Sequence, residues 1–215
     1  MAIQVKICGI NSRPALAAAI EGGAAFIGLV FYPPSPRCVD LDQAAALAAA
    51  VPDGVVRTGL LVDADDAAIA AILKRVPLDM LQLHGGESPA RLRDIRARFG
   101  RPVMKVVKVA GAEDVAAADA YGGAADRLLF DAKPPKGMLG ALPGGNAVSF
   151  DWHLLAGRRW PLPWMLSGGL TAGNVAEAAA VSGAPAVDVS SGVEDRPGVK
   201  NPEKIRAFLK AARGL

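Results

Sequence analysis

The stretch IQVKICGINSRPALAAAIEGGAAFIGLVF, residues 3–31, contains two short apolar runs separated by an alanine-rich segment. The runs 3–8 and 26–31 have the composition of strands, and the segment 14–21 has the apolar spacing of a helix. Ser12 supplies an N-cap ahead of Pro14, and Gly22 stands where the helix would stop. The stretch therefore predicts a strand, a helix and a second strand in succession.

The same alternation continues along the chain and predicts an α/β fold of eight units. Eight β–α units in 215 residues favour a closed parallel (β/α)8 barrel that forms a single domain over residues 1–215. A long loop is expected over 131–146. The expected strands are 3–8, 26–31, 55–62, 80–84, 103–107, 127–131, 164–167 and 186–190. The expected helices are 14–21, 41–50, 65–75, 89–99, 113–121, a short one after 150, 173–181 and 202–212.

Composition excludes several classes of protein. The net charge is +3 and the basic residues are scattered without interleaved aromatics, so no nucleic-acid partner is expected. Two cysteines make neither a disulfide framework nor a metal-ligand cluster, which favours a cytoplasmic protein. The longest apolar stretch, residues 24–32, is too short to cross a bilayer, and no secretory signal precedes it. We expect no membrane role.

Period-two alternation places polar side chains on the inner face of two strands. Lys6 and Cys8 share one face of the first strand, and Asp188 and Ser190 share one face of the last. Apolar residues on the opposite faces would meet the helices. Polar groups inside a barrel need partners or a ligand, since leaving one unpaired costs about 1–3 kcal/mol.

Two glycine-rich segments follow the seventh and eighth strands. Gly168 and Gly169 stand in SGGLT, and Ser190 and Ser191 stand in SSGV. Many barrels hold a phosphate group in these two loops, where backbone N–H groups can approach it closely. The glycines could instead serve only to make tight turns, but two such loops at consecutive strand ends favour a phosphate site.

Four further side chains fall at the same predicted end of the barrel: Cys8, Arg37, His84 and Asp131. Each has an ordinary structural explanation: a buried small hydrophobe, a surface charge, a core histidine, and a carboxylate that caps or pairs with Lys133. A thiol and a carboxyl at separate strand ends suggest proton transfers at two points of one small phosphorylated substrate. The thiol could act as a base if Lys6 or another cation lowers its pKa. No metal cluster or dinucleotide loop is visible, so an isomerisation without cofactor or metal is the simplest reaction class.

Several motifs resemble, in order and nearly end to end, those of the phosphoribosylanthranilate isomerases of tryptophan biosynthesis. They are KICGI, FYPPSPR, LQLHGGES, LLFDAKPPKGMLGALPGGNAVSFDW, LSGGLTAGNV and VDVSSGVEDRPGVK. The resemblance implies a TIM barrel that converts N-(5-phosphoribosyl)anthranilate to 1-(2-carboxyphenylamino)-1-deoxyribulose 5-phosphate by an Amadori rearrangement, an aldose–ketose isomerisation without cofactor. It also implies a small phosphorylated substrate as the partner and a monomer or homodimer.

The resemblance also implies a role for each candidate residue. Cys8 would be the general base and Asp131 the general acid. Arg37 would face the anthranilate carboxylate, with His84 in the same part of the pocket. The phosphate site would be formed by Gly168, Gly169, Asp188, Ser190 and Ser191.

Two other functions remain open from the residues. One is a related phosphoribosyl isomerase of histidine biosynthesis, or an enzyme that acts on both substrates. Those enzymes use a pair of aspartates, whereas Cys8 stands at the position of the base here. The other is a phosphosugar-binding barrel without activity, against which the presence of Cys8 and Asp131 argues.

Overall fold

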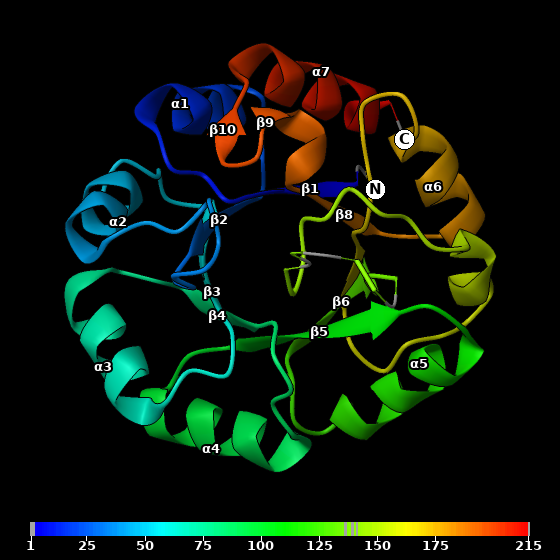
Figure 1. Cartoon of the computed structure of the whole chain (residues 1–215), viewed down its shortest axis with the longest axis horizontal. Helices are drawn as coiled ribbons and strands as arrows, with labels where there is room; N and C mark the ends of the chain where they lie inside the picture. Colours follow the sequence, from blue (N-terminus) through cyan, green and yellow to red (C-terminus); the bar gives the residue numbers. More distant parts are fainter. Residues whose placement is uncertain (1–2, 136, 139, 141, 215) are drawn as a thin grey trace.

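Eight parallel strands close into a barrel in the computed structural model, which describes residues 3–135, 137–138, 140 and 142–214. Each strand pairs with the next along the chain, and β8 pairs with β1 to close the ring. The helices form an outer ring around it (Figure 1). The predicted α/β TIM barrel is thereby confirmed.

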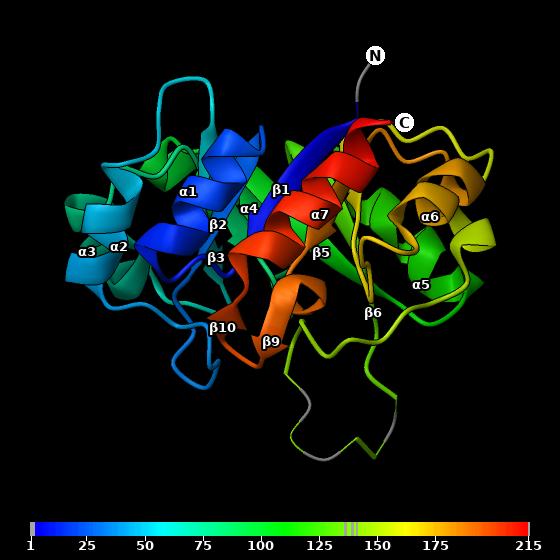
Figure 2. The same cartoon turned by 90° about the horizontal axis from the view of Figure 1, so that it is seen from above.

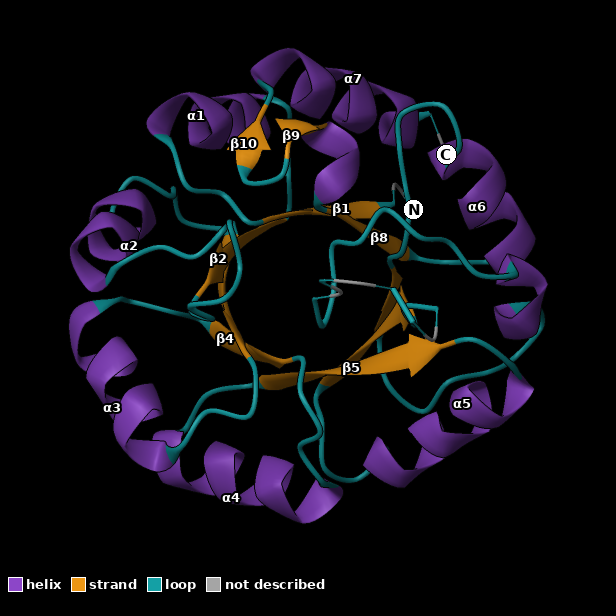
Figure 3. Cartoon of the chain, viewed as in Figure 1, coloured by secondary structure: helices purple, strands orange, loops and turns teal. Residues whose placement is uncertain are grey.

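The strands, orange in Figure 3, form the inner ring. Their bounds lie close to the predicted ones. They are β1 (Gln4–Cys8), β2 (Phe26–Val30), β3 (Val56–Leu61), β4 (Met80–Leu83), β5 (Val103–Val109), β6 (Arg127–Ala132), β7 (Trp164–Leu166) and β8 (Ala186–Val189). His84, Ser167 and Ser190 were expected as strand termini but directly follow β4, β7 and β8 instead.

The helices of the outer ring are mostly capped by their own preceding side chains. They are α1 (Arg13–Glu21), α2 (Leu41–Ala48), α3 (Asp66–Arg75), α4 (Pro89–Phe99), α5 (Ala112–Ala117), α6 (Val175–Ser182) and α7 (Pro202–Arg213). Side-chain oxygens accept hydrogen bonds from first-turn amides at five N-caps: Ser12, Asp40, Asp65, Ser88 and Asn201. These caps satisfy amides that a helix start leaves without backbone partners.

Within the described ranges, three short 3₁₀ helices and a small hairpin depart from the regular pattern. The predicted helix 113–121 is divided into α5 and η1 (Ala118–Tyr121), and the short helix expected after residue 150 is η2 (Trp152–Leu155). After β8 come η3 (Ser191–Val193) and an antiparallel pair, β9 (Glu194–Arg196) and β10 (Val199–Lys200), which the sequence pattern did not predict.

The barrel has two distinct faces, as the alternation predicts. Val5, Ile7, Val187 and Val189 lie outward in the large core between strands and helices. The lower interior of the barrel is filled by apolar side chains: Phe26, Met104, Val106, Leu129, Met165 and Ala186. Above this layer the interior becomes polar.

The segment that joins β6 to η2 projects from the carboxyl end of the barrel, opposite the two chain termini (Figure 2). It contains the long loop expected over 131–146, of which residues 136, 139 and 141 lie outside the described residues. Among the described helices, none has the length and apolar character needed to cross a membrane.

Candidate active site

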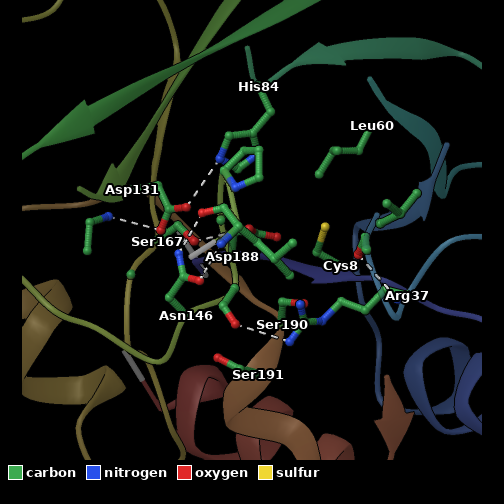
Figure 4. A pocket seen from close by; sticks show the side chains of 18 of the residues that line it. Cys8, Arg37, Leu60, His84, Asp131, Asn146, Ser167, Asp188, Ser190 and Ser191 are labelled. Atoms are coloured by element: carbon green, nitrogen blue, oxygen red, sulfur yellow. Dashed lines mark hydrogen bonds and ion pairs between the residues drawn. The ribbon is translucent and has the colours of Figure 1, made fainter. Parts of the chain in front are cut away.

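A pocket opens at the carboxyl ends of the strands, where the barrel fold leads one to expect a site. All nine residues singled out from the sequence line it: Cys8, Arg37, His84, Asp131, Gly168, Gly169, Asp188, Ser190 and Ser191. Figure 4 shows the side chains of several of them pointing toward one another from different strands. The structural role that each residue could have by itself does not require these side chains to line one pocket.

A buried ion pair forms the floor of the pocket. Lys6 on β1 is fully buried, and its Nζ lies 2.9 Å from Oδ1 of Asp188 on β8. Ser167 Oγ donates to the other carboxylate oxygen, Oδ2, at 3.1 Å. The pair therefore joins the first and last strands of the barrel directly below Cys8.

The Cys8 thiol is buried beside this pair, and the sequence left open which cation acts on it. Burial raises the pKa of the thiol, Lys6 lowers it, Asp188 raises it again, and Lys200 lowers it. The balance is a raised pKa, so the cations offset only part of the cost of burial. The lowered thiol pKa that the sequence led us to expect from Lys6 or another cation is therefore not found.

Lys6 is held as a cation by its surroundings. Burial alone would lower the pKa of Lys6, but the charge of Asp188 and the neighbouring thiol outweigh it and raise the pKa. An ammonium group paired with Asp188 therefore stands next to Cys8.

Asp131 is the last inward-facing residue of β6. Its Oδ1 accepts a hydrogen bond from the Ala132 amide at 3.0 Å, and its Oδ2 lies 3.3 Å from Nε2 of His84. Lys133, the alternative partner considered from the sequence, instead pairs with Asp114 at 2.9 Å. Asp131 is thus directed at the pocket and at His84.

His84 is supported from below by Gln82 on the same face of β4. Gln82 Nε2 lies 3.4 Å from His84 Nδ1. Above them, a Cβ added at Gly144 would lie 2.5 Å from His84 Cε1 and 2.7 Å from Asp131 Oδ2. The β6–η2 segment therefore approaches the two groups so closely that any larger residue at this position would displace His84 or Asp131.

Arg37 reaches into the pocket as expected, but part of its guanidinium is already engaged. Nε and Nη2 each lie 2.8 Å from one carboxylate oxygen of Glu194, and Nη2 also donates to the Gly145 carbonyl at 3.2 Å. Arg37 is only 4 % exposed, so it is not a surface charge. The resemblance implies that Arg37 binds a substrate carboxylate. Glu194 already binds Nε and Nη2 of the guanidinium, so Nη1 is the end that remains for a ligand.

The two glycine-rich loops lie side by side at the other end of the pocket. Gly168 and Gly169 have φ of 91° and 64°, a region that favours glycine. A Cβ on Gly168 would lie 2.8 Å from the Ala132 amide nitrogen. Asn174 ties the loop together, accepting from the Thr171 amide at 2.7 Å and donating to the Gly169 carbonyl at 3.0 Å.

Several residues at or behind the pocket were not singled out from the sequence as site residues. They are Gln82 and Ser167 in its polar lining, Gly144 above Asp131, and Glu194 and Lys200 behind Arg37. The alternation places Gln82 on the face of His84, and inward parity from Met165, two residues before Ser167, could have indicated Ser167. The other three depend on contacts between distant segments and leave no local signal. In the described ranges, no group of three or more His, Cys, Asp or Glu side chains is arranged to hold a metal ion.

The chain is similar to known proteins over almost its whole length. The family model for N-(5'phosphoribosyl)anthranilate (PRA) isomerase matches residues 5–211. The N-(5'-phosphoribosyl)anthranilate isomerase of Paramagnetospirillum magneticum is 61 % identical over 214 residues, covering 100 % of this chain and 99 % of the relative. That of Rhodospirillum centenum is 61 % identical over 215 residues, covering both chains fully.

Solved structures are similar over almost the whole chain. The phosphoribosyl anthranilate isomerase of Thermotoga maritima has a TM-score of 0.87 and 36 % identity, covering 99 % of this chain and 100 % of that one. A phosphoribosyl anthranilate isomerase in complex with reduced 1-(o-carboxyphenylamino)-1-deoxyribulose 5-phosphate has a TM-score of 0.85 and 34 % identity, with the same coverage.

Proposed function

The chain belongs to the N-(5'-phosphoribosyl)anthranilate isomerase family, and from that premise we propose which of its residues carry out each step of the reaction. The reaction is the isomerisation of N-(5'-phosphoribosyl)anthranilate in tryptophan biosynthesis. It converts an aminoaldose into an aminoketose, so protons must move at the ring oxygen and at C2. Cys8 and Asp131, both buried at the mouth of one pocket, carry this proposal.

Asp131 acts first, as the general acid. Its carboxyl proton passes to the furanose ring oxygen, the C1–O bond breaks with its electron pair on oxygen, and an iminium forms between C1 and the anthranilate nitrogen. The Ala132 amide, 3.0 Å from Oδ1, stabilises the carboxylate that remains. A positioned acid of this kind contributes about 10²–10⁴ in rate.

Cys8 acts second, as the general base. The iminium makes the C2 proton acidic, the thiolate removes it, and the C–H electron pair becomes the C1=C2 double bond of an enolamine. Loss of the hydroxyl proton at C2 and protonation at C1 then give the ketone. Lys6 and Lys200 favour the thiolate form, against the burial and the Asp188 charge that raise the thiol pKa.

Substrate binding uses the two ends of the pocket. The Nη1 end of Arg37 faces the anthranilate carboxylate, with His84 alongside. Gly168, Gly169, Ser190 and Ser191 contribute their loops to the phosphate site, and Asp188 holds Lys6 and Ser167 beneath it. No cofactor enters the scheme, because both steps are proton transfers.

Two matched pairs of variants test the catalytic roles, with substrate consumption followed by anthranilate fluorescence. Cys8→Ser and Asp131→Asn should each lower kcat by at least about 10²-fold. The controls are Cys38→Ser, at the other free cysteine, and Asp119→Asn, whose side chain on η1 is 61 % exposed. Turnover like that of the wild type in a folded Cys8 or Asp131 variant would refute the role of that residue.

We further propose that the chain works in the cytoplasm as a monomer or homodimer. Its two free cysteines support the cytoplasmic location. The description of the Thermotoga maritima relative as dimeric supports the homodimer. Cell fractionation and light scattering of the purified protein test these two statements.

A further inference from the structure

A cluster of buried charges lies behind the pocket, on the small hairpin that follows β8. Glu194 begins β9 and stands opposite Lys200, the last residue of β10. Arg37 reaches this pair from the loop after β2, and Ser190 reaches it from the end of β8. The hairpin therefore touches both the carboxylate end and the phosphate end of the proposed substrate site.

Glu194 is saturated with cationic and amide partners. Its Oε1 lies 2.8 Å from Arg37 Nε and 2.7 Å from Lys200 Nζ, and its Oε2 lies 2.8 Å from Arg37 Nη2 and 3.3 Å from the Gly198 amide. Burial alone would raise the pKa of Glu194, but Arg37 and Lys200 outweigh it and the pKa is lowered. Glu194 is therefore an anion that fixes the plane of the guanidinium.

Lys200 uses its remaining donors on the phosphate loop. Its side chain is 0 % exposed, and besides Glu194 its Nζ donates to the Ser190 carbonyl at 2.8 Å and to Ser190 Oγ at 3.2 Å. An ammonium group has three N–H donors, so all three are assigned. The position of Ser190 thus depends on Lys200, and the position of Lys200 depends on Glu194.

Stability does not account for this cluster. Replacing buried ion pairs by apolar residues is often neutral or stabilising, because the cost of desolvation offsets the attraction between the charges. Arg37, Glu194 and Lys200 also leave one positive charge in excess, and among the described residues no second carboxylate pairs with either cation. A positive excess next to the pocket suits a substrate that carries a carboxylate and a phosphate.

We propose that Glu194 and Lys200 are positioning residues that couple the two ends of the substrate site, Glu194 by orienting Arg37 and anchoring Lys200, and Lys200 by holding Ser190. The proposal rests on the roles given above to Arg37 and to the loop containing Ser190 and Ser191. By this proposal, the β9–β10 hairpin sets the distance between the protein groups that bind the carboxylate and those that bind the phosphate of the substrate.

Two competitive inhibitors probe the two ends separately: benzoate for the carboxylate end and inorganic phosphate for the phosphate end. Their inhibition constants are measured against the fluorescent substrate for the wild type, Arg37→Met, Lys200→Met and Glu194→Gln. The control is Glu203→Gln, whose side chain is 81 % exposed on α7. Thermal melts establish that each variant is folded.

The proposal predicts a distinct pattern for each variant, with a threefold increase in the inhibition constant as the dividing line. In Lys200→Met the inhibition constant of phosphate rises more than threefold. That of benzoate does not, because Arg37 and Glu194 remain as a neutral pair. In Glu194→Gln both inhibition constants rise more than threefold, and in Glu203→Gln neither does. A purely structural role would shift both probes together in every variant.

Other results overturn the proposal. An increase below threefold for phosphate in Lys200→Met, or for either probe in folded Glu194→Gln, refutes the coupling. Glu194→Gln leaves two buried cations without a counter-charge, so if it does not fold the Lys200→Met pattern alone decides. If Arg37→Met leaves the benzoate constant unchanged, the assumed role of Arg37 fails instead, and the two failures are thereby distinguished.

Discussion

Gly28→Ala should misplace the proposed catalytic base without touching the ends of the substrate site. Gly28 lies on the inner face of β2, opposite Cys8 in the strand register. A Cβ added there would lie 3.0 Å from Cys8 Sγ, 3.1 Å from Cys8 Cα and 3.2 Å from Lys6 Nζ. The thiol and the ammonium must therefore both move by a few tenths of an ångström.

The size of the effect follows from this displacement. Overpacking of this kind costs about 1–3 kcal/mol, and in a chain of this length each kcal/mol lowers Tm by about 2–4 °C. Because a 1 Å misplacement can cost about 10²-fold in rate, a shift of a few tenths of an ångström should lower kcat by roughly 3- to 10-fold. KM should change little, because Arg37 and the phosphate loops are not displaced.

Anthranilate fluorescence gives kcat and KM, and calorimetry gives Tm. The matched control is Gly123→Ala, where an added Cβ meets nothing within 4 Å. A folded Gly28→Ala enzyme with the kcat of the wild type would refute the claim that the position of Sγ limits the reaction. A large rise in KM at unchanged kcat would refute the separation of the base from the binding contacts.

Two further predictions concern the buried ion pairs. Lys6→Met leaves Asp188 without its cation, so unfolding in urea should show a loss of about 3–5 kcal/mol; a loss below about 1 kcal/mol would contradict the importance of the pair. Burial would raise the pKa of Glu87, but Lys105, 2.7 Å away, outweighs it and the pKa is lowered. The stabilisation that Glu87 provides is therefore present above its unfolded pKa of about 4.3 and is lost as the pH falls further. The urea midpoints of wild type and Glu87→Gln should converge between about pH 5 and pH 3, and a constant difference would contradict this assignment.

Much of the fold could be predicted from the sequence because each strand and helix carries its own local signal. Strands such as Phe26–Val30 are apolar runs, and helices such as Pro89–Phe99 begin at a capping serine and a proline and end at a glycine. Parity then placed Lys6 and Asp188 on the inner face, where they meet. The gathering of the candidate residues followed from the barrel, since all of them lie at the carboxyl ends of strands or in the loops that follow those ends.

The rest could not be predicted because it depends on distant segments. Glu194 and Arg37 are 157 residues apart, and their pairing turns a guanidinium expected to be free into one that is half engaged. The hairpin that carries Glu194 has strands of three and two residues with charges on them, too short for any periodicity. The thiol pKa likewise depends on burial and on three charged neighbours, of which only Lys6 is near Cys8 in sequence.

The ion pair between Lys6 and Asp188 lies across the seam where the barrel closes. Its two residues are 182 positions apart, on the first and the last strand. Contacts of such long range form late, after the loop between them has been closed at an entropic cost. The floor beneath Cys8 is therefore complete only when β8 docks, and turnover during refolding becomes a reporter of ring closure. Helical signal should return before activity does.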